Sequence, residues 1–165
     1  MPENNAKWTE EEVLEALDSV KDPEIPVISV VDLGIVRVEK ISASGVEVAL
    51  TPTFAGCPAV DVMKNGMIQA LEDRGIAPAT VRVDFKRPWS SNMISAKGRK
   101  LLMDFGLSPP PAFDGMLTLE VLQNALCPKC SSNNTYMLNA FGPTACRAVH
   151  HCRNCKETFE QFKPL

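Results

Sequence analysis

Hydrophobic and polar residues alternate with a period of two in three stretches of the first 90 residues. The alternation runs over residues 35–41, 46–51 and 80–85, and it predicts three half-buried strands. The short loop 42–45 ends in glycine and joins the first two strands as a hairpin. The pattern therefore predicts a small sheet built around this hairpin.

Apolar residues recur with helical spacing between these stretches. Thr9 and Glu12 form a capping box at the start of a helix expected over about 10–21. A second helix is expected over about 59–74, and a third ends before Gly106. With a right-handed crossover, this order predicts a small α/β domain whose helices pack on one face of a mixed sheet.

A proline-rich stretch interrupts the chain after the third helix. Residues 108–111 read Ser-Pro-Pro-Pro, which cannot continue a helix and forms a stiff, extended spacer. We therefore expect an α/β domain at residues 8–107, a proline-rich linker at 108–123 and a small C-terminal domain at 124–165.

Two Cys-x-x-Cys pairs form the strongest motif in the chain. Cys127 and Cys130 make the first pair, Cys152 and Cys155 the second, and 21 residues separate them. Such pairs bring four thiolates to the tetrahedral geometry that Zn²⁺ prefers, at a spacing close to that of a zinc-ribbon hairpin. A tail this short buries too little surface to fold without a staple. The motif predicts a C-terminal zinc ribbon, with an Fe–S cluster at the same cysteines as the alternative.

Cys57 is the thiol of the α/β domain that we expect to carry chemistry. Gly56 and Pro58 flank it, so it lies in the turn between a strand and the N-terminus of the second helix. Unpaired backbone N–H groups and the helix dipole favour a thiolate at such a place. A buried, purely structural cysteine is the alternative.

Other candidate residues have equally plain structural explanations. Asp22 and Glu24 lie in a proline-rich turn that ends the first helix, where solvated carboxylates are common. The loop 86–92 carries two cations and Trp89, so it could contact an anionic partner, or it could be a solvated turn with Trp89 over the core edge. Between the cysteine pairs, Cys146 is expected to pack in the ribbon.

His150 and His151 also lie between the two cysteine pairs. Because four sulfurs already complete a tetrahedral zinc site, we expect both histidines at the surface or beside the ligands rather than bound to the metal.

Composition narrows the classes of protein that remain. The 165 residues are 45% hydrophobic and 22% charged, and no apolar run approaches the ~20 residues that span a bilayer. The N-terminus lacks the order of a signal peptide, so we expect a cytoplasmic protein with reduced thiols and no membrane partner. Residues 1–126 have a net charge of −6 and residues 127–165 a net charge of +3. Neither part resembles a dedicated nucleic-acid surface.

Several motifs together resemble a known family. DPEIP, VVDLGIV and TPTFAGCP resemble the domain of SufT-like iron–sulfur assembly factors. PWSSNMISAKGRKLL, PPP, CPKC, AFGPTACRA and CRNCKETFEQFK resemble the PaaD family of phenylacetyl-CoA epoxidase components over about residues 10–163. The resemblance implies an accessory protein of bacterial aerobic phenylacetate catabolism, in which a diiron oxygenase and an Fe–S flavin reductase perform the chemistry.

The resemblance also implies a set of site residues. They match the family's Asp-Pro-Glu, its Thr-rich loop with one cysteine and the ribbon's FG-x-T-A-C: Asp22, Glu24, Thr51, Thr53, Cys57 and Cys146. The chain departs from the family pattern twice. Asn92 stands where an acidic residue is expected, and Ser131 stands where the first knuckle usually has glycine, so Ser131 must adopt the backbone angle that glycine adopts easily.

The leading functional hypothesis is a non-catalytic maturation factor. In it Cys57, with or without Cys146, transiently holds iron or an Fe–S cluster for the oxygenase or reductase component, together with the Fe–S assembly machinery. The alternative is a structural subunit of the oxygenase whose ribbon is a docking module. Thiol catalysis at Cys57 lacks a base, because residues 1–126 contain no histidine. The sequence leaves open the client protein, iron binding at Cys57, the role of Cys146 and the oligomeric state.

Overall fold

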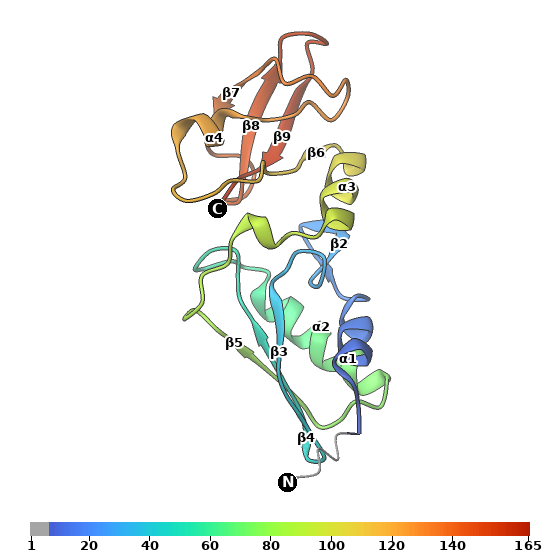
Figure 1. The fold of residues 1–165 in the computed structure, drawn as a ribbon. Coiled ribbons are helices and arrows are strands. Elements are labelled where there is room, and N and C mark those ends of the chain that lie inside the picture. The colour runs from blue at the N-terminus through green and yellow to red at the C-terminus, as the bar shows by residue number, and fades with distance from the viewer. Residues whose placement is uncertain (1–6) are drawn as a thin grey trace. The chain divides into compact units, whose positions relative to one another are not determined.

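The computed structural model describes residues 7–165 and divides the chain into two compact units after Trp89. Figure 1 shows the helices and strands of each unit. Over the described range, no helix combines the length and the apolar character that crossing a membrane requires.

The first unit is a three-stranded mixed sheet with two helices on one face (Figure 1). β3 and β4 form the expected antiparallel hairpin, and α2 crosses over so that β5 pairs with β4 in parallel. This confirms the predicted α/β fold with helices on a mixed sheet. The elements in chain order are α1 (Glu10–Leu17), β1 (Lys21–Asp22), β2 (Ile25–Ser29), β3 (Val36–Ser42), β4 (Gly45–Leu50), α2 (Val60–Asp73) and β5 (Ala79–Val83).

The first helix begins as predicted but ends earlier. Thr9 and Glu12 form both bonds of the capping box, which fixes the start of α1. α1 ends at Leu17 rather than near Lys21, because Lys21 pairs with Ser29 across the small β1–β2 sheet. The residues that the apolar spacing assigned to the last helical turn therefore lead into a strand instead.

The core of the first unit lies between the sheet and the helices. Val46, Val48 and Leu50 alternate along β4 and are almost completely buried. On α2, Met67 and Leu71 are fully buried. Burial of such side chains contributes about 1.5–3 kcal/mol each, so this layer supplies much of the stability of the unit.

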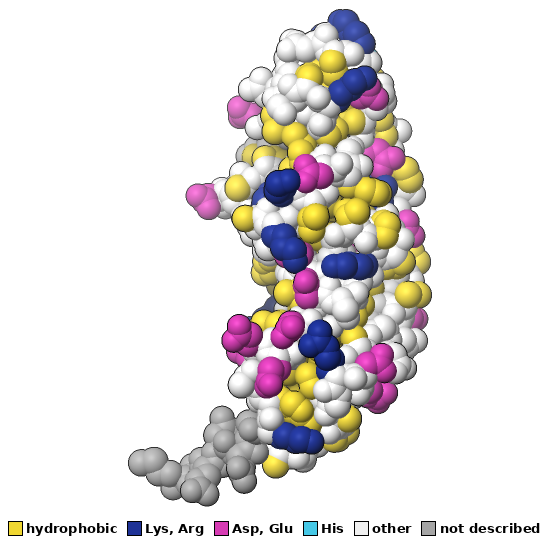
Figure 2. Space-filling view, turned by 90° about the vertical axis from the view of Figure 1, so that its right-hand side faces the viewer, with side chains coloured by type: hydrophobic (Ala, Val, Ile, Leu, Met, Phe, Trp, Pro, Cys, Tyr) yellow, Lys and Arg dark blue, Asp and Glu magenta, His cyan; other side chains and the backbone are white. Residues whose placement is uncertain are grey.

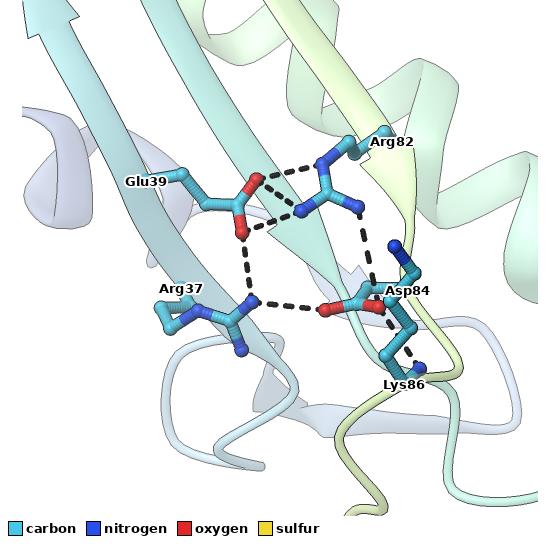
Figure 3. Close-up of polar contacts among 5 residues, drawn as sticks. All are labelled: Arg37, Glu39, Arg82, Asp84 and Lys86. Atoms are coloured by element: carbon cyan, nitrogen blue, oxygen red, sulfur yellow. Dashed lines mark hydrogen bonds and ion pairs between the residues drawn. The ribbon is translucent and has the colours of Figure 1, made fainter.

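The opposite face of the sheet carries a network of ion pairs (Figure 3). Arg37 donates to Glu39 at 2.8 Å and to Asp84 at 2.9 Å, and Arg82 donates to Glu39 at 2.6 and 2.7 Å. Ala49 lies between Arg37 and Arg82 in the strand register and is fully buried on this otherwise polar face. The charged side chains therefore cover the centre of the sheet.

Trp89 is the last residue of the first unit. Its side chain is 6% exposed, and its indole N–H donates to the carbonyl oxygen of Leu33 at 2.9 Å. Of the two explanations that the sequence allowed for the loop 86–92, this contact favours a tryptophan packed over the core.

The second unit contains the cysteine-rich ribbon and the segment before it. Its four-stranded sheet has the order β6-β9-β8-β7, with β6 parallel to β9 and the other pairs antiparallel. The elements are η1, a 3₁₀ turn (Ser91–Met93), α3 (Ala96–Phe105), β6 (Leu107–Ser108), α4 (Leu119–Gln123), β7 (Thr135–Asn139), β8 (Arg147–Cys152) and β9 (Thr158–Phe162).

The boundary between the two units lies after Trp89, whereas the sequence placed it between residues 108 and 123. β6 pairs with β9, so α3 and β6 belong with the ribbon rather than with the α/β domain. The proline-rich stretch is then an internal part of the second unit. A pairing between strands some 50 residues apart leaves no trace in local periodicity, which explains the difference.

Three residues, Arg99, Asn92 and Ser91, hold the proline-rich stretch and the C-terminus in place through hydrogen bonds. The Arg99 guanidinium donates to the carbonyl oxygens of Pro110 and Ser91. The Asn92 side-chain amide donates to the Phe113 carbonyl at 2.6 Å and accepts from the Phe113 N–H at 3.2 Å. The Ser91 N–H donates to the Leu165 carbonyl at 2.8 Å. The proline-rich stretch is therefore held in place by hydrogen bonds within the second unit.

Acidification should weaken the first unit through its ion-pair network. Hydrogen bonds from Arg37 and Arg82 lower the pKa of Glu39, and the Lys86 N–H and Arg37 lower the pKa of Asp84. Carboxyl groups with lowered folded pKa values contribute stability that is complete above their unfolded pKa values and is lost as the pH falls through the folded values. Arg37→Met should therefore destabilise the protein more at pH 7 than at pH 3.

Urea unfolding followed by tryptophan fluorescence measures this effect, because both tryptophans, Trp8 and Trp89, lie in the first unit. The matched control is Arg74→Met, which removes only the exposed pair with Glu15 and should have little effect at either pH. Equal losses at both pH values for Arg37→Met would contradict the assignment.

Asn92→Asp should loosen the proline-rich stretch. An aspartate can still accept from the Phe113 N–H, but it cannot donate to the Phe113 carbonyl, so about 1 kcal/mol of local stability should be lost. Hydrogen exchange at the Phe113 amide measures the change. Asn65→Asp adds the same charge on an exposed face of α2 and should leave that amide unchanged. Unaltered exchange in Asn92→Asp would show that the double contact contributes nothing.

Candidate metal centre

Four cysteine sulfurs converge at one end of the ribbon sheet. The Sγ atoms of Cys127 and Cys155 are 3.6 Å apart, as are those of Cys130 and Cys152, and all four lie within 4.8 Å of one another. A tetrahedral ion with Zn–S bonds of about 2.3 Å places its sulfurs about 3.8 Å apart. The cluster therefore has the size that a single zinc ion requires.

Two backbone turns of the same design present these sulfurs. In the first, the Ser131 N–H donates to the Cys127 carbonyl at 2.8 Å, and in the second the Lys156 N–H donates to the Cys152 carbonyl at 3.0 Å. Ser131 has φ 56° and Lys156 has φ 64°, the left-handed region that glycine adopts most easily. The angle expected at Ser131 is confirmed, and the second knuckle repeats it.

The electrostatics of the cluster favour a bound cation. The backbone N–H of Cys155 is the main cause that lowers the pKa of Cys152 to about 7. The N–H of Ser132 lowers the pKa of Cys130, but burial and the three neighbouring thiols outweigh it and raise that pKa to about 12. Four crowded thiolates repel one another unless a cation lies among them.

The donor set fits zinc. Cys127 and Cys152 are fully buried, and both pack with Ala125 and Phe159 in a small apolar cluster. Four sulfurs around one ion leave no open position, which is typical of a structural site. A [4Fe–4S] cluster would spread its thiolates around a larger body, so sulfurs 3.6 Å apart favour a single ion.

Cys57 lies in the turn before α2, as the sequence predicted. Its side chain is half-buried, and its carbonyl oxygen accepts from the Val60 N–H at 3.3 Å. The preceding Gly56 has φ 87°, and a Cβ there would meet nothing within 4 Å, so the angle rather than crowding requires glycine. α2 itself begins at Val60, one residue later than expected, after an Ala59 that offers no side-chain cap.

The other candidate residues of the first unit lie at or just beyond the ends of strands: Asp22 ends β1, Glu24 lies between β1 and β2, and Thr51 and Thr53 follow β4. Thr51 is 8% exposed, and its N–H donates to the Ile35 carbonyl at 2.7 Å, while Thr53 is half-buried. The Asp22 carboxylate accepts from the N–H groups of Glu24 at 2.7 Å and Ile25 at 3.2 Å, which stabilises the turn. In the described part of the chain, the four ribbon cysteines form the one group of three or more potential ligands that converge.

Cys146 lies apart from the cluster of four ribbon cysteines. It precedes β8 and Cys152 ends β8, so the length of that strand, about 20 Å for six residues, separates the two thiols. Cys146 is 8% exposed, and its sulfur lies 3.1 Å from the Thr144 hydroxyl. This burial agrees with the packing role expected for it.

The two histidines differ. His150 is fully buried against Phe159, with ring centroids 5.8 Å apart, and burial lowers its pKa, which keeps it neutral at pH 7. His151 is half-buried, and its Nδ1 lies 3.1 Å from the Thr158 hydroxyl. Of the two positions expected for the histidines, His150 takes the one beside the four cysteines, because alternation along β8 turns it into the core of the ribbon, against the Phe159 that packs with Cys127 and Cys152.

The face drawn in Figure 2 shows no large patch of a single charge. Acidic and basic side chains are interspersed over it, with hydrophobic side chains between them. Nucleic-acid binding needs clustered cations, so this face does not provide such a surface.

Two family models match the chain, one in each unit. The model described as an iron–sulfur cluster assembly protein matches residues 10–85, and the one described as the PaaD zinc beta ribbon domain matches residues 115–163. A protein of Escherichia coli K12, described as the putative D subunit of 1,2-phenylacetyl-CoA epoxidase, is 33% identical over 92% of this chain and 91% of its own length. The chain belongs to the PaaD family of phenylacetyl-CoA epoxidase components.

Other similar proteins match the N-terminal part of this PaaD-family chain. An Fe–S protein maturation auxiliary factor of Porphyromonas gingivalis W83 is 35% identical over 56% of this chain and 89% of its own. The crystal structure of a domain of unknown function (DUF59) from Bacillus anthracis matches with a TM-score of 0.52 at 25% identity, over 56% of this chain and 90% of its own. A conserved hypothetical protein from Thermotoga maritima matches with a TM-score of 0.50 at 30% identity, over 62% and 98%.

Cys152→Ser should lose the metal and unfold the ribbon. Intact protein should contain one zinc per chain, whereas the variant should contain almost none, because a structural zinc site in a small module supplies about 10–16 kcal/mol of folding free energy. Elemental analysis measures the zinc, and the NMR signals of the first unit should persist.

The matched control for this variant is Cys146→Ser, which changes a thiol at the other end of β8 and should keep the full zinc content. A Cys152→Ser protein that retains one zinc per chain would exclude Cys152 as a ligand.

Proposed function

We propose that this protein is an accessory maturation factor of the phenylacetyl-CoA epoxidase system in aerobic phenylacetate catabolism. It assists the assembly of a metal or Fe–S centre in the oxygenase or reductase component and does not itself catalyse epoxidation. The observation that carries the proposal is the pairing, in one chain, of an iron–sulfur assembly domain over residues 10–85 with a PaaD ribbon over residues 115–163. The relatives named for the epoxidase and for Fe–S protein maturation support the same role.

In this proposal Cys57 is the group that holds the cargo. Its thiol is half-buried in a turn, whereas the sulfurs of the four ribbon thiols converge within 4.8 Å of one another, as a single-ion site requires. A thiolate is a suitable iron ligand, and a site with fewer than four protein sulfurs can release its metal or cluster. Asp22, Glu24, Thr51 and Thr53, which lie at or near the ends of strands in the first unit, are the further candidate residues for this site. Cys146 is a further candidate thiol.

The two kinds of cysteine then have different roles. The ribbon cysteines hold zinc for folding, because a saturated tetrahedral site has no position for exchange. Cys57 exchanges iron or an Fe–S cluster with the Fe–S assembly machinery and with the client protein. Both histidines of the chain lie in the second unit, so the first unit contains no histidine that could act as the base, which argues against thiol catalysis at Cys57.

A structural component of the oxygenase is the second candidate, and one observation favours it. Tyr136, Leu138 and Phe141 of the ribbon expose 36%, 52% and 74% of their surface. Exposed apolar side chains close together in sequence are typical of protein interfaces. In this candidate the ribbon is a docking module and the epoxidase needs the protein in stoichiometric amounts.

Cys57→Ala should abolish growth on phenylacetate in a strain that lacks the natural protein, while the melting temperature changes by only a few degrees. Cys57→Ser is the matched control for packing, because it keeps the size of the side chain but removes the iron-binding thiolate, and it should fail as well. Growth with Cys57→Ser, or strong destabilisation by Cys57→Ala, would support a purely structural cysteine.

The strain without this protein separates the two candidate functions. Its oxygenase and reductase polypeptides should be present but deficient in iron or Fe–S clusters, as measured by metal analysis and absorption spectra of the purified proteins. Fully loaded partners would rule out maturation. If their activity then returned only on adding this protein stoichiometrically, the structural role would replace it.

A further inference from the structure

The β7 edge of the ribbon carries a cluster of exposed aromatic and apolar side chains. Tyr136 and Leu138 lie on β7, and Phe141 follows in the loop to β8. They expose 36%, 52% and 74% of their surface, within six residues of sequence. Aromatic residues of this kind are enriched at protein interfaces. We call these three side chains, with Arg153 and Lys163, the β7 surface.

β7 is an edge strand: apart from a hydrogen bond from the Thr135 hydroxyl to the Ala125 carbonyl at its start, no strand of the described residues lies on its second side. The sheet order is β6-β9-β8-β7, so within residues 7–165 β7 pairs with β8 alone. The register shifts between Met137 and Asn139, so Leu138 occupies a bulge. Bulges at sheet edges redirect a side chain, and here the bulged leucine is more than half exposed. Edge strands bind extended peptides by main-chain pairing, with side-chain contacts for selectivity.

The charges on the β7 surface indicate the chemistry of what binds there. The Arg153 guanidinium lies 4.4 Å from the Tyr136 ring centroid, and the Lys163 ammonium lies 5.5 Å from that of Phe141. The two acidic residues after Cys127 are paired elsewhere, Glu157 with Lys129 at 2.6 Å and Glu160 with Arg147 at 2.8 Å. Arg153 is exposed, and Lys163 is half-buried with its ammonium 3.3 Å from the Ala140 carbonyl oxygen, so the charge that the β7 surface offers to a partner is positive.

We propose that the β7 surface docks an extended segment of a partner protein that carries apolar and acidic side chains on the same face. Apolar side chains of the segment pack on Tyr136, Leu138 and Phe141, and its carboxylates meet Arg153 and Lys163, which lie over the same rings. Every second side chain of a strand lies on one face, so a segment with apolar and acidic residues in turn at every second position can pair with the edge and meet both the rings and the cations. The inference rests on the proposed maturation role only for the identity of the protein that carries the segment, namely the oxygenase or reductase component.

The test uses the full-length, zinc-loaded protein and two synthetic ten-residue peptides. In one peptide valine and glutamate take turns at every second position, with threonine between them, and in the other lysine replaces each glutamate. The glutamate peptide should bind in the micromolar range expected of a small interface and shift the NMR signals of β7, while the lysine peptide should bind at least about tenfold more weakly. Raising the salt concentration should weaken the binding of the glutamate peptide, because Arg153 is exposed to solvent and Lys163 is partly exposed.

Two variants locate the binding site. Leu138→Lys places a charge in the apolar cluster, and Arg153→Glu reverses one cation, so each should lower the affinity for the glutamate peptide at least about tenfold. Both should retain one zinc per chain, which shows that the ribbon is folded. Phe105→Ser is the matched control, because it removes a side chain of α3 that is 47% exposed outside the β7 surface, and it should bind as the natural protein does.

Several outcomes would overturn the proposal. These are equal affinity for the two peptides, no binding of the glutamate peptide at millimolar concentration, or NMR shifts outside β7 and its neighbours. Dimerisation that Leu138→Lys abolishes would assign the surface to a second copy of this chain. Peptide binding does not depend on metal-centre assembly, so loaded partner proteins in the deletion strain would refute maturation and leave this inference standing.

Discussion

The second unit depends on four thiolates that are crowded into a space the size of one ion. Like charges at such distances destabilise a fold unless a cation lies among them, and a cation bound there would join two knuckles that are 21 residues apart in sequence. The sheet alone cannot replace this cross-link, because a small ribbon buries little apolar surface. Both knuckles even accept left-handed backbone angles at Ser131 and Lys156, which indicates how strongly the sulfur geometry determines the local conformation.

Around that centre, the second unit is assembled from distant parts of the chain. β6 joins the sheet through β9, Asn92 holds Phe113, and Ser91 holds the C-terminal Leu165. Asn92 is the residue that departs from the family's acidic pattern, and its amide can donate as well as accept, which a carboxylate cannot do. The ribbon is thus one part of a larger unit that begins directly after Trp89.

The first unit is stabilised in a different way from the second, and its cysteine lies in a different environment. A conventional apolar layer between sheet and helices stabilises it, and a charged network covers the other face of the sheet at Ala49. Cys57 lies outside the fully buried core, in a turn whose backbone depends on the positive φ of Gly56. A stable scaffold with one half-buried thiol, combined with a separately stabilised ribbon, is consistent with an accessory protein that holds a cargo with one unit and contacts partners with the other.

The sequence by itself predicted those features of the structure that depend on short-range patterns of residues. Alternation predicted β3, β4 and β5, the capping box predicted the start of α1, and the paired cysteines predicted the ribbon and its four ligands, because each signal depends on residues adjacent in sequence or on a ligand set of known geometry. Only the tertiary structure decided that α3 and β6 join the ribbon, that His150 is buried and that Cys146 lies a strand's length from the metal cluster. Contacts such as Asn92 with Phe113, 21 residues apart, and Leu165 with Ser91, 74 residues apart, form only when distant segments pack, so no local periodicity records them.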